Sequence, residues 1–367
     1  MSSENNDQSM TNRTRAEAGS RADMGKHGRY STPPEEGETS LFADPDEPLL
    51  AVRDVRTYFD TDEGTVKASD GVSFDIQPGE IVGLVGESGC GKSVTSRSLM
   101  RLIQSPGYNP SGKLNFDGLD LMDLSKEEIR QVRGNRISMI FQEPMSALNP
   151  VFDIGWQVGE PLRVHEGLKK KAAREEAVEL MRKVGIPSPE ERVDDYPHQF
   201  SGGMRQRAMI SMALACKPDL LIADEPTTSL DVTIEAQILE LIQELNERQD
   251  MAVLIVTHDL GVVAETCDKV AVMYAGRIVE YADVETIFAD PRHPYTKGLL
   301  NCIPDPRSDD QDLSPIEGQV PDLADPPEGC NFADRCPYAT PECETTDPRL
   351  REVDDNHLSA CIWEDPQ

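Results

Sequence analysis

The residues best suited to bind a nucleotide form a glycine-rich loop. The segment Gly86-Glu87-Ser88-Gly89-Cys90-Gly91-Lys92-Ser93 fits the pattern G-x-x-x-x-G-K-[ST]. Its glycines let consecutive backbone N–H groups face a phosphate chain, Lys92 would contact the β- and γ-phosphates, and Ser93 would place its hydroxyl on Mg²⁺. A glycine-rich turn without a ligand is the alternative. Because a chance match in a chain of this length is on the order of 1%, we predict phosphate binding.

Two acidic residues follow a second apolar run. Leu220-Leu221-Ile222-Ala223 predicts a buried strand that ends at Asp224 and Glu225. An Asp at the carboxyl end of such a strand lies beside a phosphate loop and can hold Mg²⁺ through water. The adjacent Glu can act as general base towards the attacking water. Alone, this pair is more often a solvated strand end, but the upstream loop and the downstream Thr228-Ser229-Leu230-Asp231 favour a catalytic interpretation.

A second glycine-rich helix start precedes this strand. It consists of Ser201, Gly202 and Gly203, with Gln206 one turn later. The N-terminus of a helix attracts phosphate through its free N–H groups and its dipole. The phosphate loop, however, already supplies that helix end for the chain's own nucleotide. The sequence therefore predicts a second copy of the fold facing this one, with ATP between the two.

Together these motifs resemble the ATP-binding subunits of ABC transporters, over residues 49–365. In that family the SGG helix start of one subunit binds the γ-phosphate held by the other subunit. This role carries over to Ser201, Gly202, Gly203 and Gln206, while Met204 stands where the family often has Gln. The resemblance implies a subunit that hydrolyses ATP, because every catalytic position is filled.

The resemblance assigns further residues. Gln142, in the segment Ile140-Phe141-Gln142-Glu143-Pro144, matches the Q-loop glutamine that senses Mg²⁺ and water and touches the transmembrane partner. His258 matches the switch histidine on the γ-phosphate, and Asp231 matches an aspartate at the dimer interface. Tyr58 or Phe59 would stack on the adenine, and each could instead be plain strand packing.

The sequence around the motifs predicts the elements that position them. Apolar residues alternate in the segments 49–55 and 72–76, which predicts an antiparallel layer, and the run 81–85 predicts a strand leading into the phosphate loop and a helix starting near Lys92. Residues 172–184 form the clearest amphipathic helix. Further strands are expected near Leu220, Val253 and Val270, with a hairpin through Ala275-Gly276. We therefore predict an α/β fold, a P-loop NTPase of ABC type with an antiparallel β layer, a helical subdomain and a cysteine-rich C-terminal extension.

These elements suggest three regions. Residues 1–48 are polar and acidic with few aliphatic side chains, so we expect a disordered tail. Residues 49–282 would form the nucleotide-binding domain, with the helical subdomain at about 143–200. Residues 283–367 would form the C-terminal extension.

The charge balance is strongly acidic. The chain carries 67 acidic and 36 basic side chains, a net charge of −31. Such a surface repels nucleic acid and also repels itself at low ionic strength, which suggests the cytoplasm of a haloarchaeon at molar salt. The flexible ends could carry the excess instead, but acidic residues are spread along the whole chain.

The C-terminal region resembles that of one subfamily of ABC transporter subunits. Pro291-Arg292-His293-Pro294-Tyr295-Thr296 resembles the H-P-Y-T segment of the oligopeptide and dipeptide importer subfamily, which also includes nickel importers. Four cysteines follow, and thiolates in a proline-rich tail suggest a metal site. Their gaps suit an Fe–S cluster better than the close pairs of a zinc site, although zinc or free thiols stay open. The subfamily implies a [4Fe–4S] cluster in a structural role; its ligands would be Cys330, Cys336, Cys343 and Cys361.

The other four cysteines, Cys90, Cys216, Cys267 and Cys302, are scattered along the chain, and we expect them to be reduced. No apolar run approaches the ~18–20 residues that a membrane-spanning helix needs, and no signal segment is seen at the start. We therefore expect a peripheral protein on the cytoplasmic face of the membrane.

The resemblance implies ATP-driven import of peptides or similar small solutes. The partners would be a second, non-identical ABC ATPase subunit, two transmembrane permeases and an extracellular solute-binding protein, and no nucleic acid. The alternatives are an importer for nickel or a sugar, a soluble ABC ATPase without membrane subunits, a subunit that binds but barely hydrolyses ATP, and an exporter cassette. A single cassette with complete motifs and this C-terminal region favours the importer.

Overall fold

A computed structural model describes residues 48–142, 147–226, 232–303 and 315–363. The chain first forms an antiparallel sheet, as the alternating apolar residues predict. Strand β1 (Leu50–Thr61) pairs with β2 (Gly64–Ile76), β4 (Gly107–Tyr108) and β5 (Lys113–Phe116), and β6 (Leu119–Asp120) extends the edge beyond β5. The strand order is β2-β1-β5-β6.

A larger mixed sheet carries the functional loops. Its order in the described part of the chain is β12-β13-β11-β10-β3-β9-β8-β7. The strands from β10 to β7 are parallel, and β11, β13 and β12 continue the sheet antiparallel. Their bounds are β3 Ile81–Val85, β7 Ile137–Ile140, β8 Leu220–Asp224, β9 Ala252–Thr257, β10 Lys269–Tyr274, β11 Arg277–Asp283, β12 Arg351–Asp354 and β13 His357–Ser359. The predicted strands near Leu220, Val253 and Val270 and the hairpin after Val270 are confirmed.

The mixed sheet separates two hydrophobic cores because successive residues of a strand face opposite sides. In β8, Leu220 and Ile222 pack towards the antiparallel sheet, α1 (Lys92–Leu99) and α2 (Lys126–Val132). Leu221 and Ala223 pack on the other side, against the helices between β7 and β9. Strands buried on both faces read as continuous apolar runs, as β3, β8 and β9 do.

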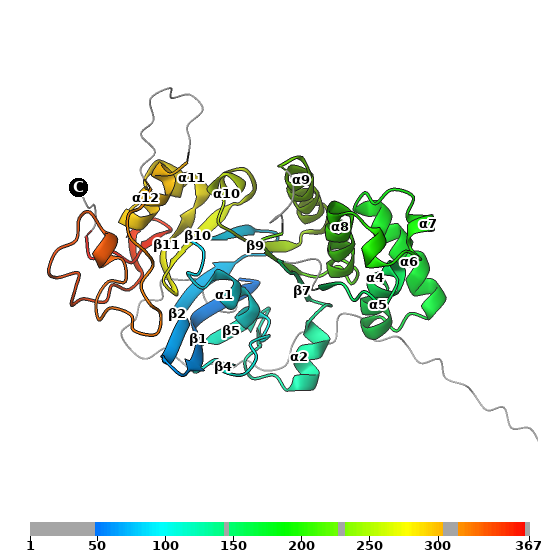
Figure 1. Ribbon diagram of the computed structural model, residues 1–367, viewed down its shortest axis with the longest axis horizontal. Coiled ribbons are helices and arrows are strands. Elements are labelled where there is room, and N and C mark those ends of the chain that lie inside the picture. Colours follow the sequence, from blue (N-terminus) through cyan, green and yellow to red (C-terminus); the bar gives the residue numbers. More distant parts are fainter. Residues whose placement is uncertain (1–47, 143–146, 227–231, 304–314, 364–367) are drawn as a thin grey trace, which may run out of the picture. The chain divides into compact units, whose positions relative to one another are not determined.

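The helices between β7 and β9 form one group, drawn in green in Figure 1. They are α4 (Ile154–Val158), α5 (Glu160–His165), α6 (Lys170–Lys183), α7 (Pro189–Arg192), the 3₁₀ turn η2 (Pro197–Gln199), α8 (Gly202–Ala213) and α9 (Val232–Gln249). Helix α6 confirms the predicted amphipathic stretch and buries one face, formed by Ala173, Ala177, Val178, Leu180 and Met181.

The C-terminal region packs on the far edge of the mixed sheet (Figure 1). It includes α11 (Val284–Ala289), α12 (Pro294–Asn301) and the short turn η3 (Ala333–Arg335), whereas α10 (Leu260–Thr266) lies between β9 and β10. Tyr274, Tyr295 and Phe332 share a third core, with ring centroids 4.6 to 5.5 Å apart. The C-terminal region thus contributes two strands, β12 and β13, and buried aromatic packing. No helix in the described residues is long and apolar enough to cross a membrane.

Candidate functional site

The phosphate loop joins β3 to α1, as predicted. Gly86 and Gly91 have φ angles of +155° and +108°, a region that side chains disfavour. A Cβ atom at Gly86 would overlap the carbonyl oxygen of Met273, and one at Gly91 would overlap that of Ala68. The loop is therefore pressed against β10 and β2, and only glycine fits at these two positions.

Lys92 lies in the cradle of this loop. Its side chain is buried, and Nζ donates to the carbonyl oxygens of Gly86 at 2.8 Å and Glu87 at 3.0 Å. The ammonium is thus held over the turn of the loop, where the phosphates of a nucleotide would replace these carbonyls as partners. Helix α1 begins at Lys92.

The loop is connected to the acidic strand end. Ser93 Oγ donates to Asp224 Oδ1 at 2.9 Å. Asp224 is fully buried and its other oxygen, Oδ2, has no hydrogen-bond partner among the described residues, while burial raises the pKa of this carboxyl. A buried, unpartnered carboxylate oxygen beside a hydroxyl is a set of hard oxygen donors, which fits Mg²⁺.

The predicted catalytic residues converge on Glu225. Gln142 Nε2 donates to Glu225 Oε2 at 2.6 Å, and His258 Nδ1 lies 3.4 Å from Oε1. Glu225 has a positive φ of 46°, and its N–H donates to Val256 O at 2.9 Å, which fixes it at the end of β8 beside β9. A non-glycine residue in this region is strained, and such strain is common at catalytic sites. The structure therefore brings Gln142, His258 and Glu225 together, next to Asp224.

The SGG residues form the start of α8, as predicted. Ser201 caps α8, and its Oγ accepts from the N–H of Met204 at 3.3 Å. A Cβ at Gly202 would meet no atom of the described residues within 4 Å. Gln206, one turn after the exposed Ser201 and Gly202, is buried, and its Nε2 donates to the carbonyl oxygen of Pro226. Gln206 therefore connects α8 to the strand end that carries Glu225.

The two aromatic candidates for adenine stacking lie on β1 and have different neighbours. Tyr58 Oη donates to Asp70 Oδ1 at 2.6 Å, and its ring meets Tyr108 edge-on at 6.2 Å. Phe59 lies against Gly107. Asp231, predicted at the dimer interface, lies outside the described residues.

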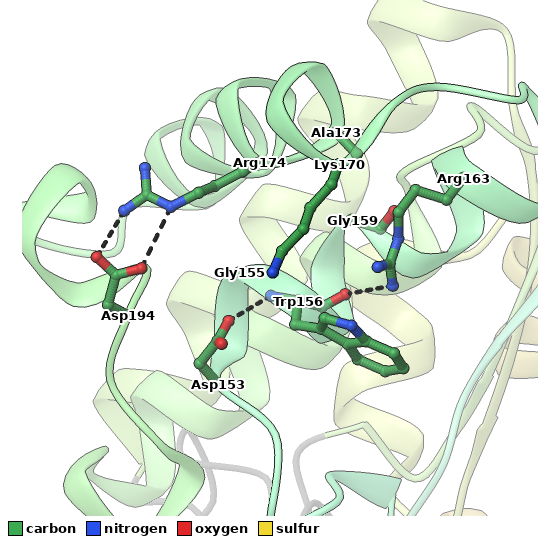
Figure 2. A pocket seen from close by; sticks show the side chains of 9 residues that line it. All are labelled: Asp153, Gly155, Trp156, Gly159, Arg163, Lys170, Ala173, Arg174 and Asp194. Atoms are coloured by element: carbon green, nitrogen blue, oxygen red, sulfur yellow. Dashed lines mark hydrogen bonds and ion pairs between the residues drawn. The ribbon is translucent and has the colours of Figure 1, made fainter.

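A pocket opens among α4, α5 and α6 (Figure 2). It has a volume of about 200 Å³ and three basic lining residues, Arg163, Lys170 and Arg174. The guanidinium of Arg163 lies 4.4 Å over the ring of Trp156, and Arg174 pairs with Asp194 at 2.6 Å.

Apolar side chains close to these residues in the sequence are exposed. Phe152 stacks on Trp156 with ring centroids 4.1 Å apart and is 37% exposed, and Val151 and Val164 are 70% and 61% exposed. No motif in the sequence predicts this pocket. Its lining residues are Asp153, Gly155, Trp156, Gly159, Arg163, Lys170, Ala173, Arg174 and Asp194.

The four C-terminal cysteines share one neighbourhood. Cys330 donates its backbone N–H to Cys343 O at 2.8 Å, and burial raises the pKa of the Cys330 thiol to about 11, with further increases from Cys343, Cys361 and Cys336. All are free cysteines. Among the described residues, however, no three His, Cys, Asp or Glu side chains are arranged to hold a metal ion. The geometry thus places the thiols near one another without forming the predicted cluster site.

Sequence reasoning missed two residues that touch the phosphate loop. Arg335 Nη1 and Nη2 donate to the Glu87 carboxylate at 2.8 and 3.0 Å. Tyr295 Oη accepts the N–H of Glu87 at 2.9 Å. The sequence draws attention to both segments, through H-P-Y-T and the cysteines around Arg335, but gives no signal that they reach the nucleotide site.

The fold and this site define a P-loop NTPase with the motifs of an ATP-binding cassette. A family model described as ABC transporter matches residues 69–228, and one described as oligopeptide/dipeptide transporter, C-terminal region, matches residues 279–343.

Similar proteins extend the match over most of the chain. A probable peptide ABC transporter ATP-binding protein, y4tR, of Sinorhizobium fredii is 53% identical over 315 residues, which cover 85% of this chain and 94% of the relative. The dipeptide transport ATP-binding proteins DppD of Bacillus subtilis and Escherichia coli are 52% and 48% identical, over 87% and 86% of this chain and 96% of each relative.

A solved dimeric structure of the ATP-binding cassette MJ0796, in a post-hydrolysis state with ADP and phosphate, superposes with a TM-score of 0.58. It is 26% identical and covers 64% of this chain and 98% of the cassette. The chain belongs to the ABC transporter family, among the ATP-binding subunits that carry the oligopeptide/dipeptide C-terminal region.

Proposed function

We propose that this chain hydrolyses ATP to drive the import of peptides or chemically similar small solutes. The convergence of Gln142 and His258 on Glu225, beside the Ser93–Asp224 pair, carries the ATPase part of this proposal. The names of the relatives, which include peptide and dipeptide transport proteins, support the class of solute.

The chemistry is the attack of water on the γ-phosphorus of ATP. Glu225 accepts a proton from the attacking water, the bond from the γ-phosphorus to the bridging oxygen breaks, and ADP and phosphate are the products. Gln142 orients Glu225 and the water, and His258 contacts the γ-phosphate. Mg²⁺ held by Ser93 and Asp224 would neutralise charge on the β- and γ-phosphates.

Two cassettes complete each site in this proposal. The open start of α8, at Ser201 and Gly202, would bind the γ-phosphate held by the phosphate loop of the facing subunit. The dimeric MJ0796 structure supports this arrangement, and we propose a non-identical paralogue as the partner. Residues 49–282 would act as the nucleotide-binding domain, with 143–200 as its helical subdomain and 283–367 as the C-terminal extension.

The membrane partner would dock on the helical group. The pocket of Figure 2 is lined by three basic side chains, Arg163, Lys170 and Arg174. Close to its lining residues in the sequence, Val151, Phe152 and Val164 are exposed apolar side chains. Such a surface suits a short permease helix with an acidic end. The complete assembly would add two permeases and an extracellular solute-binding protein, with this chain on the cytoplasmic face of the membrane.

Substitution of Glu225 by Gln tests the ATPase assignment. We expect turnover to fall about 10²- to 10⁴-fold, the usual contribution of a general base, with ATP binding and dimerisation retained. Glu240→Gln, on the exposed face of α9, is the matched control and should hydrolyse ATP like the wild type. Wild-type turnover in Glu225→Gln would overturn the role of this residue. Uptake of a labelled dipeptide by the assembled transporter in vesicles tests the solute class, and ATP-driven uptake of nickel or a sugar alone would contradict it.

A separate proposal concerns the four C-terminal cysteines. The shared neighbourhood of the four thiols supports a bound [4Fe–4S] cluster in a structural role, although they are not arranged as ligands in this structure. Protein purified without oxygen should show broad absorbance near 400 nm and about four irons per chain. Stoichiometric zinc in a colourless sample, or the absence of any metal, would reject the cluster.

A further inference from the structure

The C-terminal region holds the phosphate loop at one residue, Glu87. Arg335 pairs with both carboxylate oxygens of Glu87 in a two-pronged ion pair, at 2.8 and 3.0 Å. Tyr295 Oη accepts the backbone N–H of the same residue at 2.9 Å. Glu87 directly follows Gly86, which begins the loop, and its carbonyl accepts from Lys92. A single loop residue therefore contacts two side chains more than 200 positions away and the lysine expected on the phosphates.

Arg335 is held in place by groups other than Glu87. Its side chain is only 5% exposed. Nε donates to Glu317 O at 2.9 Å, and the guanidinium also reaches Ile316 O at 3.2 Å and the hydroxyl of Tyr274 at 3.3 Å. Because these contacts fix the guanidinium, the Arg335 charge is presented to Glu87 from a rigid support, and the loop is the element that responds.

Tyr295 is an equally rigid support. It is fully buried between Tyr274 and Phe332, with ring centroids at 4.6 and 5.5 Å. It lies in the first turn of α12, where the N–H of Tyr295 donates to His293 Nδ1 at 3.1 Å. The N–H of Glu87 is therefore committed to the C-terminal region and is not available to a phosphate.

The charge of Glu87 matters for a site that binds a polyphosphate. An unpaired carboxylate in the loop would repel the phosphates of ATP, since like charges separated by several ångströms interact strongly where water is partly excluded. Arg335 cancels this charge and draws the carboxylate towards the C-terminal region. On the basis of the proposed function, we propose that Arg335 and Tyr295 are positioning residues of the ATP site, which act through Glu87 to set the affinity for ATP.

A double-mutant cycle on the full-length chain tests this role by titration with a fluorescent ATP analogue. Arg335→Gln leaves the Glu87 carboxylate unpaired, and we expect the Kd for the analogue to rise about tenfold, a like-charge interaction of about 1.4 kcal/mol. Glu87→Gln in the Arg335→Gln background removes that charge and should bring Kd back to within about threefold of the wild type. Arg335→Lys, which keeps the charge but not the two parallel N–H donors of the guanidinium, should give an intermediate Kd.

Controls separate this role from a structural one. Arg349→Gln removes an exposed arginine of the same region that pairs with Asp347, and its Kd should not change. An unchanged Kd in Arg335→Gln, or failure of Glu87→Gln to restore binding in the double variant while the protein stays folded, would overturn the proposal. Lys92→Ala tests the ATP site itself: if this variant binds the analogue like the wild type, the proposed function fails, whatever the result at Arg335.

Discussion

Removal of the Glu280 carboxylate should destabilise the protein, because it is the acceptor at the centre of a buried network. Glu280 is fully buried in β11. Its Oε1 accepts the N–H of Arg292 at 2.6 Å and lies 2.7 Å from His357 Nε2, and its Oε2 accepts the N–H of His293 at 3.0 Å. The network joins β11, the segment before α12, and β13.

The loss in free energy of unfolding follows from the hydrogen bonds that each Glu280 variant loses. Glu280→Gln can keep its oxygen at the Oε1 position but turns an NH₂ group towards the N–H of His293. One buried donor then loses its acceptor, at a cost of about 1–3 kcal/mol. Glu280→Ala loses all three acceptor contacts and leaves a cavity, which we expect to cost about 3–5 kcal/mol.

Thermal unfolding followed by circular dichroism measures this effect. With about 2 °C per kcal/mol for a domain of this size, Glu280→Gln should lower the midpoint by about 2–6 °C and Glu280→Ala by about 6–10 °C. Glu285→Gln, on the exposed side of α11, is the matched control and should unfold like the wild type. If Glu280→Ala unfolds within about 1 °C of this control, the network does not hold the C-terminal region and the reasoning is refuted.

Two further predictions concern pH and salt. Burial lowers the pKa of His293 to about 4, against an opposing effect of Glu280. The unfolded chain therefore protonates His293 at a higher pH than the folded chain does. The free energy of unfolding should keep its full value above about pH 6.5 and fall by up to about 3 kcal/mol as the pH drops through 4. His293→Asn keeps an acceptor for the N–H of Tyr295, and its unfolding midpoint should change less between pH 7 and pH 4; an equal change would contradict the assignment. The net charge of −31 predicts that the unfolding midpoint rises from dilute to several molar KCl, because salt shortens the range of repulsion from ~10 Å at 0.1 M to ~3 Å at 1 M. A midpoint that is flat or falls with KCl would reject the halophile hypothesis.

Much of the fold could be predicted because its signals are local. The run 81–85 followed by a glycine-rich loop predicts a buried strand, a turn and a helix start, and β3 and α1 lie there. The spacing of apolar residues in α6 likewise predicts one buried face. The strands β12 and β13 escaped prediction because they are short. Strand β12 is half-exposed, and β13 lies between β12 and β11, a pairing that only the tertiary fold creates.

By itself, the sequence predicted which residues would carry the chemistry, since each belongs to a contiguous motif whose residue types suit phosphate or water: the phosphate loop, Asp224, Glu225, Gln142, His258 and the SGG helix start. Only the tertiary structure decided which of these residues meet. The contacts of Glu225 with Gln142 and His258 span 83 and 33 positions, and that of Glu87 with Arg335 spans 248. Such distant contacts leave no periodic pattern in the chain, because they depend on the order of strands in the sheet and on the packing of the C-terminal region against it.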